Sequence, residues 1–177
     1  MKKITTLLLS ALLTLSAIAL TACEQKEEGR YYYEDKYSFS ILVPDGWDTN
    51  EGLMGTTVAI LSPLEGTDDP FSDNVTITTE ELPMVMSLDE YLKAGIAAAG
   101  AMLENYEVGE PTKVTIDNKE ALWFTYTYTM GGEDLKSIVY IVIDGTVAYL
   151  IGGSSTATDY DKYQEAFKKT CESFRLE

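Results

Sequence analysis

The sequence predicts an α+β fold in which one antiparallel β-sheet of about six or seven strands is sandwiched between helices. Short alternating or β-branched runs recur along residues 31–177, several of them are joined by tight turns, and two segments carry apolar residues at helical spacing. The chain has 177 residues, 45% of them hydrophobic and 12 of them tyrosine. This composition suffices for a single domain over residues 31–177 with its own core.

The first three strands are predicted in the first half of that domain. Residues 37–43 alternate between apolar and small polar side chains, and residues 44–46, Pro-Asp-Gly, form a turn before Trp47. Residues 56–61 are a β-branched run, and residues 74–80 alternate around Val75 and Ile77.

A helix is predicted to begin at Ser87, because Ser87 and Glu90 have the spacing of a capping box. Its apolar face repeats at intervals of three and four residues and consists of Leu88, Tyr91, Leu92, Ile96, Ala99, Met102, Leu103 and Tyr106. The small residues Gly95, Ala97, Ala98 and Gly100 are interpreted as a thin segment that lets a sheet approach closely.

Four further strands, joined by tight turns, are predicted at residues 113–116, 121–130, 135–143 and 146–151. The turns fall at residues 117–118, 131–132 and 144–145. The last of them, Asp144-Gly145, is read as a type I′ turn in which both central residues have positive φ. Residues 138–143 are apolar on both faces, which predicts a central strand covered on each side.

The last helix is predicted to start at a Thr158 cap. One face carries Tyr160, Tyr163, Phe167, Thr170, Cys171 and Phe174. Cys171 is interpreted as a small buried hydrophobe, because no histidine or second free thiol is present to activate it.

The N-terminus predicts export and lipid attachment. Lys2 and Lys3 precede an uncharged stretch over residues 4–20, which is typical of a signal peptide. The following Leu20-Thr21-Ala22-Cys23 resembles the lipobox of bacterial lipoproteins, so residues 1–22 are predicted to be removed and Cys23 to be acylated. An uncleaved membrane anchor is the alternative.

Lipid attachment at Cys23 predicts a protein of the bacterial cell membrane that faces outside the cytoplasm. Residues 23–30 then form the lipidated cysteine and a flexible tether. Loss of two lysines with residues 1–22 leaves 11 basic and 29 acidic residues, a net charge of −18.

The composition also limits the chemistry. The 29 acidic and 13 basic residues give a net charge of −16 for the whole chain, so no nucleic-acid partner is predicted. The chain has no histidine, the commonest general base and metal ligand, and it matches none of the common serine, zinc or thiol enzyme motifs. No catalytic residue and no cofactor is therefore predicted.

One segment resembles a known family. Residues 37–47, Tyr-Ser-Phe-Ser-Ile-Leu-Val-Pro-Asp-Gly-Trp, are similar to the opening motif of PsbP-like and DcrB-like proteins, an aromatic strand that ends in Pro-x-Gly-Trp. The resemblance implies a PsbP-like α/β/α sandwich. The plant members of the family assist photosystem II and its Mn and Ca cofactors, and its bacterial members include many lipid-anchored proteins. No ligand residue can be carried over to this chain.

Two groups of residues are candidate binding sites. Asp68, Asp69, Asp73 and Asn74 lie in an acidic loop whose oxygens suit Ca²⁺ or Mn²⁺, and the alternative is a solvated loop. Tyr31, Tyr32 and Tyr33 form a candidate interaction surface beside the tether. Trp47, Trp123, Tyr126 and Tyr128 are interpreted as core residues, with sugar or peptide stacking as the alternative.

These expectations combine into one leading hypothesis. The protein is predicted to be a non-catalytic, lipid-anchored extracytoplasmic module that binds or organises another component of the envelope, with an envelope protein as the expected partner. The alternative is a lipoprotein that binds a small ligand or a divalent metal. A carboxylate-dependent hydrolase is a third, weaker hypothesis.

Overall fold

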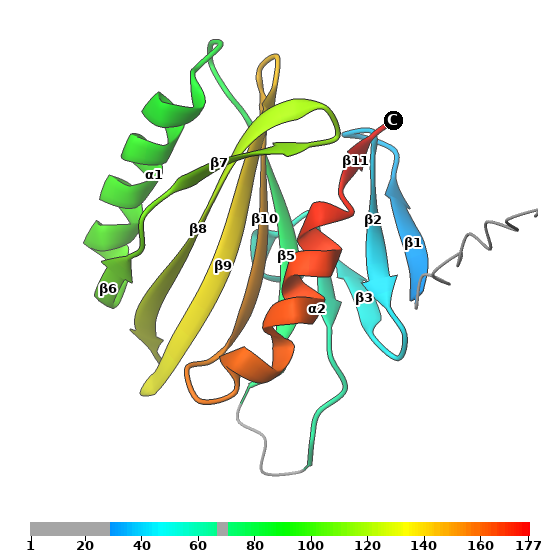
Figure 1. Ribbon diagram of the computed structural model, residues 1–177, viewed down its shortest axis with the longest axis vertical. Coiled ribbons are helices and arrows are strands. Elements are labelled where there is room, and N and C mark those ends of the chain that lie inside the picture. Colours follow the sequence, from blue (N-terminus) through cyan, green and yellow to red (C-terminus); the bar gives the residue numbers. More distant parts are fainter. Residues whose placement is uncertain (1–28, 67–70) are drawn as a thin grey trace, which may run out of the picture.

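The computed structural model describes residues 29–66 and 71–177 (Figure 1). In this part of the chain the strands are β1 (Gly29–Glu34), β2 (Phe39–Pro44), β3 (Asp48–Glu51), β4 (Val58–Leu61), β5 (Asn74–Glu81), β6 (Glu104–Val108), β7 (Thr112–Ile116), β8 (Lys119–Met130), β9 (Glu133–Asp144), β10 (Val147–Thr156) and β11 (Arg175–Leu176). The α-helices are α1 (Leu88–Met102) and α2 (Tyr160–Glu172), and a short 3₁₀ helix spans Leu53–Gly55.

The strands form two antiparallel sheets, which confirms the α+β class. The larger sheet has eight strands in the order β3-β4-β5-β10-β9-β8-β6, with β7 paired to the other half of β8. The smaller sheet has the order β1-β2-β11. All seven predicted strands are present, but β2 belongs to the smaller sheet rather than to a single common one. Strands β1, β3, β6 and β11 were not predicted, because they are short or lack apolar alternation.

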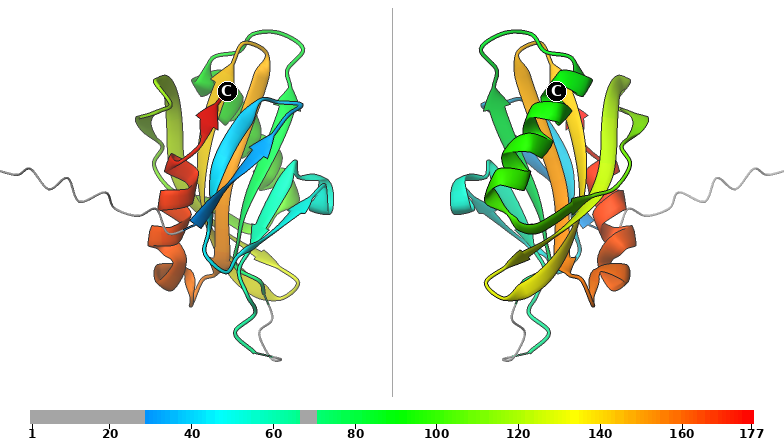
Figure 2. Two further views of the ribbon diagram at one scale, coloured as in Figure 1. Left: turned by 90° about the vertical axis from the view of Figure 1, so that its right-hand side faces the viewer. Right: turned by 90° about the vertical axis from the view of Figure 1, so that its left-hand side faces the viewer.

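The two helices cover opposite faces of the larger sheet (Figures 1 and 2). Along β9, Ile138, Tyr140 and Val142 belong to the core cluster that contains the buried residues of α2. Val139 and Ile141 belong to a second cluster with Tyr91 of α1. The prediction of a central strand covered on both faces is therefore confirmed.

Helix α1 begins as predicted and ends earlier. The Ser87 Oγ accepts a hydrogen bond from the Glu90 backbone N–H at 3.3 Å, and the Glu90 Oε2 accepts one from the Ser87 N–H at 3.0 Å. This is the predicted capping box. The chain then turns extended at Leu103 and pairs as β6 with β8, so the prediction that the helix face continues to Tyr106 is wrong.

Two of the hairpin turns lie at the predicted residues, and the third is shifted by one residue from the predicted Asp144-Gly145. Both central residues have positive φ at residues 117–118 and again at residues 131–132, as a type I′ turn requires. In the β9–β10 hairpin Asp144 pairs with Val147, so the central residues are Gly145 and Thr146. Only Gly145, with φ of 60°, is in the left-handed region, which fits type II′ and corrects the predicted type I′ turn.

The N-cap position of helix α2 is Asp159 rather than the predicted Thr158, and the Asp159 side chain makes no capping hydrogen bond to the helix backbone. The Asp159 N–H donates to the Thr156 Oγ1 at 3.2 Å, and that hydroxyl donates to the Asp159 Oδ2 at 2.9 Å. The buried residues of α2 are Tyr160, Phe167, Thr170 and Cys171, all on the predicted face. Complete burial raises the pKa of the Cys171 thiol, which accords with its interpretation as a small core residue.

Candidate functional site

Helix α1 is the most unusual surface feature of the described residues. Tyr91 is its one buried residue, and the Tyr91 hydroxyl donates a hydrogen bond of 2.6 Å to the Glu80 Oε2 on β5. Burial, followed by this contact with a carboxylate, raises the pKa of Tyr91. The helix is therefore attached to the sheet along a narrow strip, and most of its circumference faces solvent.

The exposed side of α1 carries no charge beyond its first turns. Asp89, Glu90 and Lys93 are the charged residues of the helix, and residues 94–103 include none. We define the α1 surface as the exposed residues at helical spacing: Ala94, Ala97, Ala98, Ala101 and Met102. Met102 has 84% of its surface exposed, and the loop before the helix adds Met84 at 67% and Val85 at 73%.

This surface corrects the sequence interpretation of the small residues. They were expected to let a sheet approach closely, but Ala97 and Ala98 are exposed, and a Cβ atom on Gly95 would meet no other atom within 4 Å. A helix that is apolar or small on nearly all sides is normally buried. When such a helix is exposed on an acidic domain, it is typical of a contact surface for another macromolecule.

Within residues 29–66 and 71–177, neither helix combines the length and hydropathy needed to cross a bilayer.

The α1 surface lies across the molecule from the point where the described chain begins. Figure 1 places α1 on one side and β1 on the other, and the two views of Figure 2 have β1 and α1 on opposite faces. Strand β1 starts at Gly29, two residues before the predicted domain start. The sheet and α2 therefore separate the N-terminal end of the domain from the α1 surface.

The candidate metal residues are divided between described and undescribed parts of the chain. Asp68 and Asp69, like Cys23, lie outside the described residues. Asp73 is 4% exposed, and its Oδ1 accepts a hydrogen bond of 2.5 Å from the Ser155 hydroxyl. Asn74 donates to the Ser72 carbonyl at 2.9 Å. The described residues hold no group of three or more acidic or cysteine side chains placed to bind a metal, and metal binding by the loop stays a prediction.

The three consecutive tyrosines do not share one surface, because they lie on a strand. Tyr32 packs against Phe39 with ring centroids 6.4 Å apart, and its hydroxyl donates to the Glu51 Oε1 at 2.9 Å. Tyr31 and Tyr33 lie on the other face, with ring centroids 6.4 Å apart, and Tyr33 is 64% exposed. Without a predicted strand at β1, the sequence could not separate them.

Of the remaining aromatic candidates, Trp47 is buried, and Trp123, Tyr126 and Tyr128 are half-buried. Trp47 is buried against Tyr163 and Phe167, which confirms its interpretation as a core residue. Tyr126 and Tyr128 are stacked with centroids 5.6 Å apart and are half-buried on the α1 side of the sheet. Burial raises the pKa of Tyr126 to about 12, so its hydroxyl is uncharged at neutral pH.

A cleft of about 420 Å³ between β7 and α2 is lined by acidic, basic and aromatic side chains. Its lining includes Asp117, Tyr140, Glu172 and Arg175. The Tyr140 hydroxyl donates to the Glu172 Oε1 at 2.9 Å, and the Asp117 Oδ2 accepts from the Leu176 N–H at 2.9 Å. The Arg175 guanidinium donates to the carbonyls of Glu172 and Phe174. These groups bind each other and hold the C-terminal end of the chain in place.

Comparison with known proteins identifies the fold. A family model described as PsbP-like protein matches residues 18–176. The solution structure of cyanobacterial PsbP from Synechocystis is 15% identical, with 89% of this chain and 99% of that chain covered and a TM-score of 0.63. No curated protein matches the sequence.

Two other bacterial structures share the fold. LpqN, which is involved in cell envelope biogenesis of Mycobacterium tuberculosis, is 12% identical, with 83% of this chain and 89% of that chain covered and a TM-score of 0.60. PA94 from Pseudomonas aeruginosa, a protein of unknown function, is 14% identical, with 78% and 90% covered and a TM-score of 0.55. These identities establish the common fold alone.

Proposed function

The chain belongs to the PsbP-like protein family, and from this premise we propose that it is a non-catalytic binding module of the bacterial envelope. In this proposal, acylation of Cys23 holds the domain on the outer side of the cell membrane. The α1 surface then binds another envelope protein. The proposal adds three statements to the family assignment: the cellular location, the binding surface and the class of partner.

The α1 surface is the observation that carries the proposal. An uncharged stretch over residues 94–103 is exposed on a chain with 29 acidic residues. Such a surface has little electrostatic cost of desolvation when a partner covers it. The small alanine side chains let a partner backbone approach closely, and Met102 is a flexible side chain that adapts to an irregular contact.

The position of β1 supports an α1 surface that faces away from the membrane rather than one that lies against it. Residues 24–28 would separate the acylated Cys23 from Gly29, and as a flexible coil they would span about 12 Å. A domain held at β1 would direct α1 away from the bilayer, since the two lie on opposite sides of the molecule (Figure 2). The acidic domain would also be repelled by anionic headgroups.

The comparison with known structures supports a location in the cell envelope. The structurally similar LpqN is described as involved in cell envelope biogenesis. The lipobox sequence Leu20-Thr21-Ala22-Cys23 supplies the independent reason to place this chain in the same compartment.

Photocrosslinking in cells tests the proposal. A photo-reactive phenylalanine analogue is placed at position 98 in the α1 surface and, as a matched control, at position 161 on α2, where the Asp161 side chain is 90% exposed. We expect a discrete protein adduct from position 98 that is absent from position 161 and is lost in the Cys23→Ala variant. The same adducts from both positions would contradict the proposal.

A further inference from the structure

A cleft of about 380 Å³ lies between the end of β2 and the middle of α2. Strand β11 pairs with β2 only at Phe39 and Ser40, so no strand separates the second half of β2 from the helix (Figure 1). The Leu42 N–H donates to the Ser173 Oγ at 2.8 Å, and this hydroxyl donates to the Thr170 carbonyl at 2.6 Å. These two hydrogen bonds fix the strand against the helix beside the cleft.

The cleft contains a buried polar atom without a partner. Thr170 lines the cleft and is 0% exposed, and its Oγ1 makes no hydrogen bond. A threonine hydroxyl inside a helix commonly donates to the carbonyl four residues earlier, which here belongs to Ala166. Because a buried hydroxyl without a partner is costly, a ligand that hydrogen-bonds to it is favoured.

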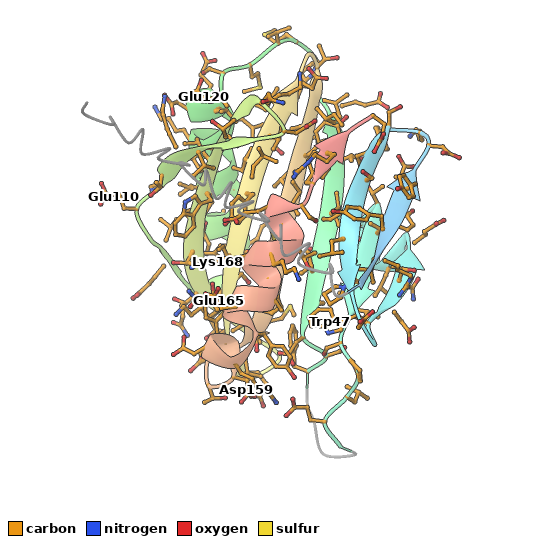
Figure 3. The ribbon with its side chains drawn as sticks, turned by 45° about the vertical axis from the view of Figure 1, so that its right-hand side comes forward. Trp47, Glu110, Glu120, Asp159, Glu165 and Lys168 are labelled. Carbon is orange, nitrogen blue, oxygen red and sulfur yellow. The ribbon has the colours of Figure 1, made fainter. Side chains whose placement is uncertain are left out.

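The rim of the cleft carries charged groups of both signs. Asp45 follows β2 and Lys169 lies on α2, and both are exposed. Within the described part of the chain neither forms an ion pair. Glu165, which also lines the cleft and is labelled on α2 in Figure 3, lies 3.9 Å from Lys168 with its side chain 89% exposed. The rim therefore offers free groups of both signs.

We propose that this cleft binds a small zwitterionic ligand, an amino acid or short peptide. Lys169 binds the ligand carboxylate, and Asp45 with Glu165 binds its ammonium group. Thr170 Oγ1 hydrogen-bonds to a polar atom of the ligand, and Leu42, Pro44 and Ala166 contact an apolar side chain. The volume lies within the range of small-molecule sites. The inference goes beyond the proposed function, because the cleft is formed by α2 and β2 rather than by α1.

Calorimetric titration of the protein purified from its native envelope in detergent tests the proposal. The probes are leucine and the dipeptide alanyl-leucine, together with the dipeptide acetylated at its N-terminus or amidated at its C-terminus. We expect saturable binding of an unmodified probe, and about tenfold weaker binding of each blocked dipeptide, because each lacks one charge. Leucine binding would assign the site to free amino acids, and binding of the dipeptide alone would assign it to peptides.

Variants separate the cleft from the rest of the surface. Lys169→Gln is expected to weaken binding about tenfold and Thr170→Val several-fold. Lys162→Gln, two turns earlier on α2 and outside the cleft lining, is the matched control. Lys162 pairs with Glu65 rather than with a cleft residue, so this variant should leave binding unchanged. Thr170→Val should be at least as stable to heat as the unmodified chain, since it removes an unpartnered hydroxyl.

Three results would overturn the proposal. They are no saturable heat with either unmodified probe at about 10 mM, equal binding of the blocked and unmodified dipeptides, and equal weakening by Lys162→Gln and Lys169→Gln. The adduct test at position 98 is independent of all three outcomes.

Discussion

The two helices cover opposite faces of the same sheet, and they differ in how many residues they bury and in the charge of their exposed side. Helix α2 places four residues in the core and has charged residues on its outer side, including Asp161, Lys162 and Glu165. Helix α1 buries one residue, Tyr91, and its outer side over residues 94–103 is uncharged. On both helices most of the large apolar residues face the sheet, but the exposed side is charged on α2, whereas on α1 it consists mostly of alanine. The comparison teaches that α2 stabilises the domain and that α1 is available for contact.

The largest expected difference between the helices is in their contribution to stability. Phe167 of α2 is fully buried among Trp47, Tyr160 and Tyr163. Phe167→Ala is expected to lower the free energy of unfolding by about 3 to 5 kcal/mol through loss of contacts and a residual cavity.

The matched change on α1 is Ile96→Ala, because Ile96 is half-buried. We expect it to cost less than half as much as Phe167→Ala. Urea unfolding followed by circular dichroism measures both variants. Equal losses would break the distinction between a stabilising and a presented helix.

Two glycine-to-alanine substitutions, one packed against α2 and one inside α1, are expected to change stability in opposite directions. A Cβ atom on Gly153 of β10 would overlap the Phe167 ring, so Gly153→Ala forces α2 away from the sheet and is expected to cost about 1 to 3 kcal/mol. Gly95 lies inside α1 with open space around it, so Gly95→Ala is expected to stabilise the protein by about 0.5 to 1 kcal/mol.

Thermal unfolding of the two glycine variants checks the opposite signs. A destabilising Gly95→Ala would mean that another group packs against the α1 surface within the domain itself.

Alkaline pH offers a smaller, titratable test of the α2 side. Burial raises the pKa of Tyr160 to about 12, whereas an unfolded tyrosine ionises near pH 10. The raised folded-state pKa means that the stabilising contribution of the uncharged hydroxyl is fully present below about pH 10 and is lost as the pH rises to about 12.

Tyr160→Phe isolates this contribution. The Tyr160 hydroxyl has no hydrogen-bond partner, so the variant should be no less stable at pH 7 and should retain more of its stability at pH 11. The urea midpoint at both pH values measures the effect. An equal fall of the midpoint in both proteins would remove Tyr160 as a source of alkaline instability.

The sequence predicted what local patterns determine. The capping box at Ser87 and the burial of both faces of residues 138–143 follow from side-chain spacing, and the structure contains both. Strand β3, Asp-Thr-Asn-Glu, was missed because an edge strand can be polar and pair only through its backbone. Leu103 and Tyr106 continued the helical spacing of α1 although the chain had already become β6.

The candidate sites were harder to predict than the helices and strands, because they depend on tertiary structure. Spacing alone cannot decide which side of α1 faces the sheet, because alanine and glycine occupy most of its turns. The tyrosines at residues 31–33 separated only when β1 placed them on alternate faces. Asp45 and Lys169 are more than 120 residues apart, and the cleft that they line is formed by packing of α2 on β2.

Methionine oxidation in native envelopes tests the central claim most directly, because the chain contains its own control. Met102 belongs to the α1 surface and Met84 lies in the loop before α1, whereas Met54, with 89% of its surface exposed, lies in the 3₁₀ helix between β3 and β4. All three should oxidise readily in the purified protein. In intact envelopes we expect Met84 and Met102 to be protected while Met54 is oxidised as before. Equal oxidation of all three in envelopes would contradict a bound partner on α1.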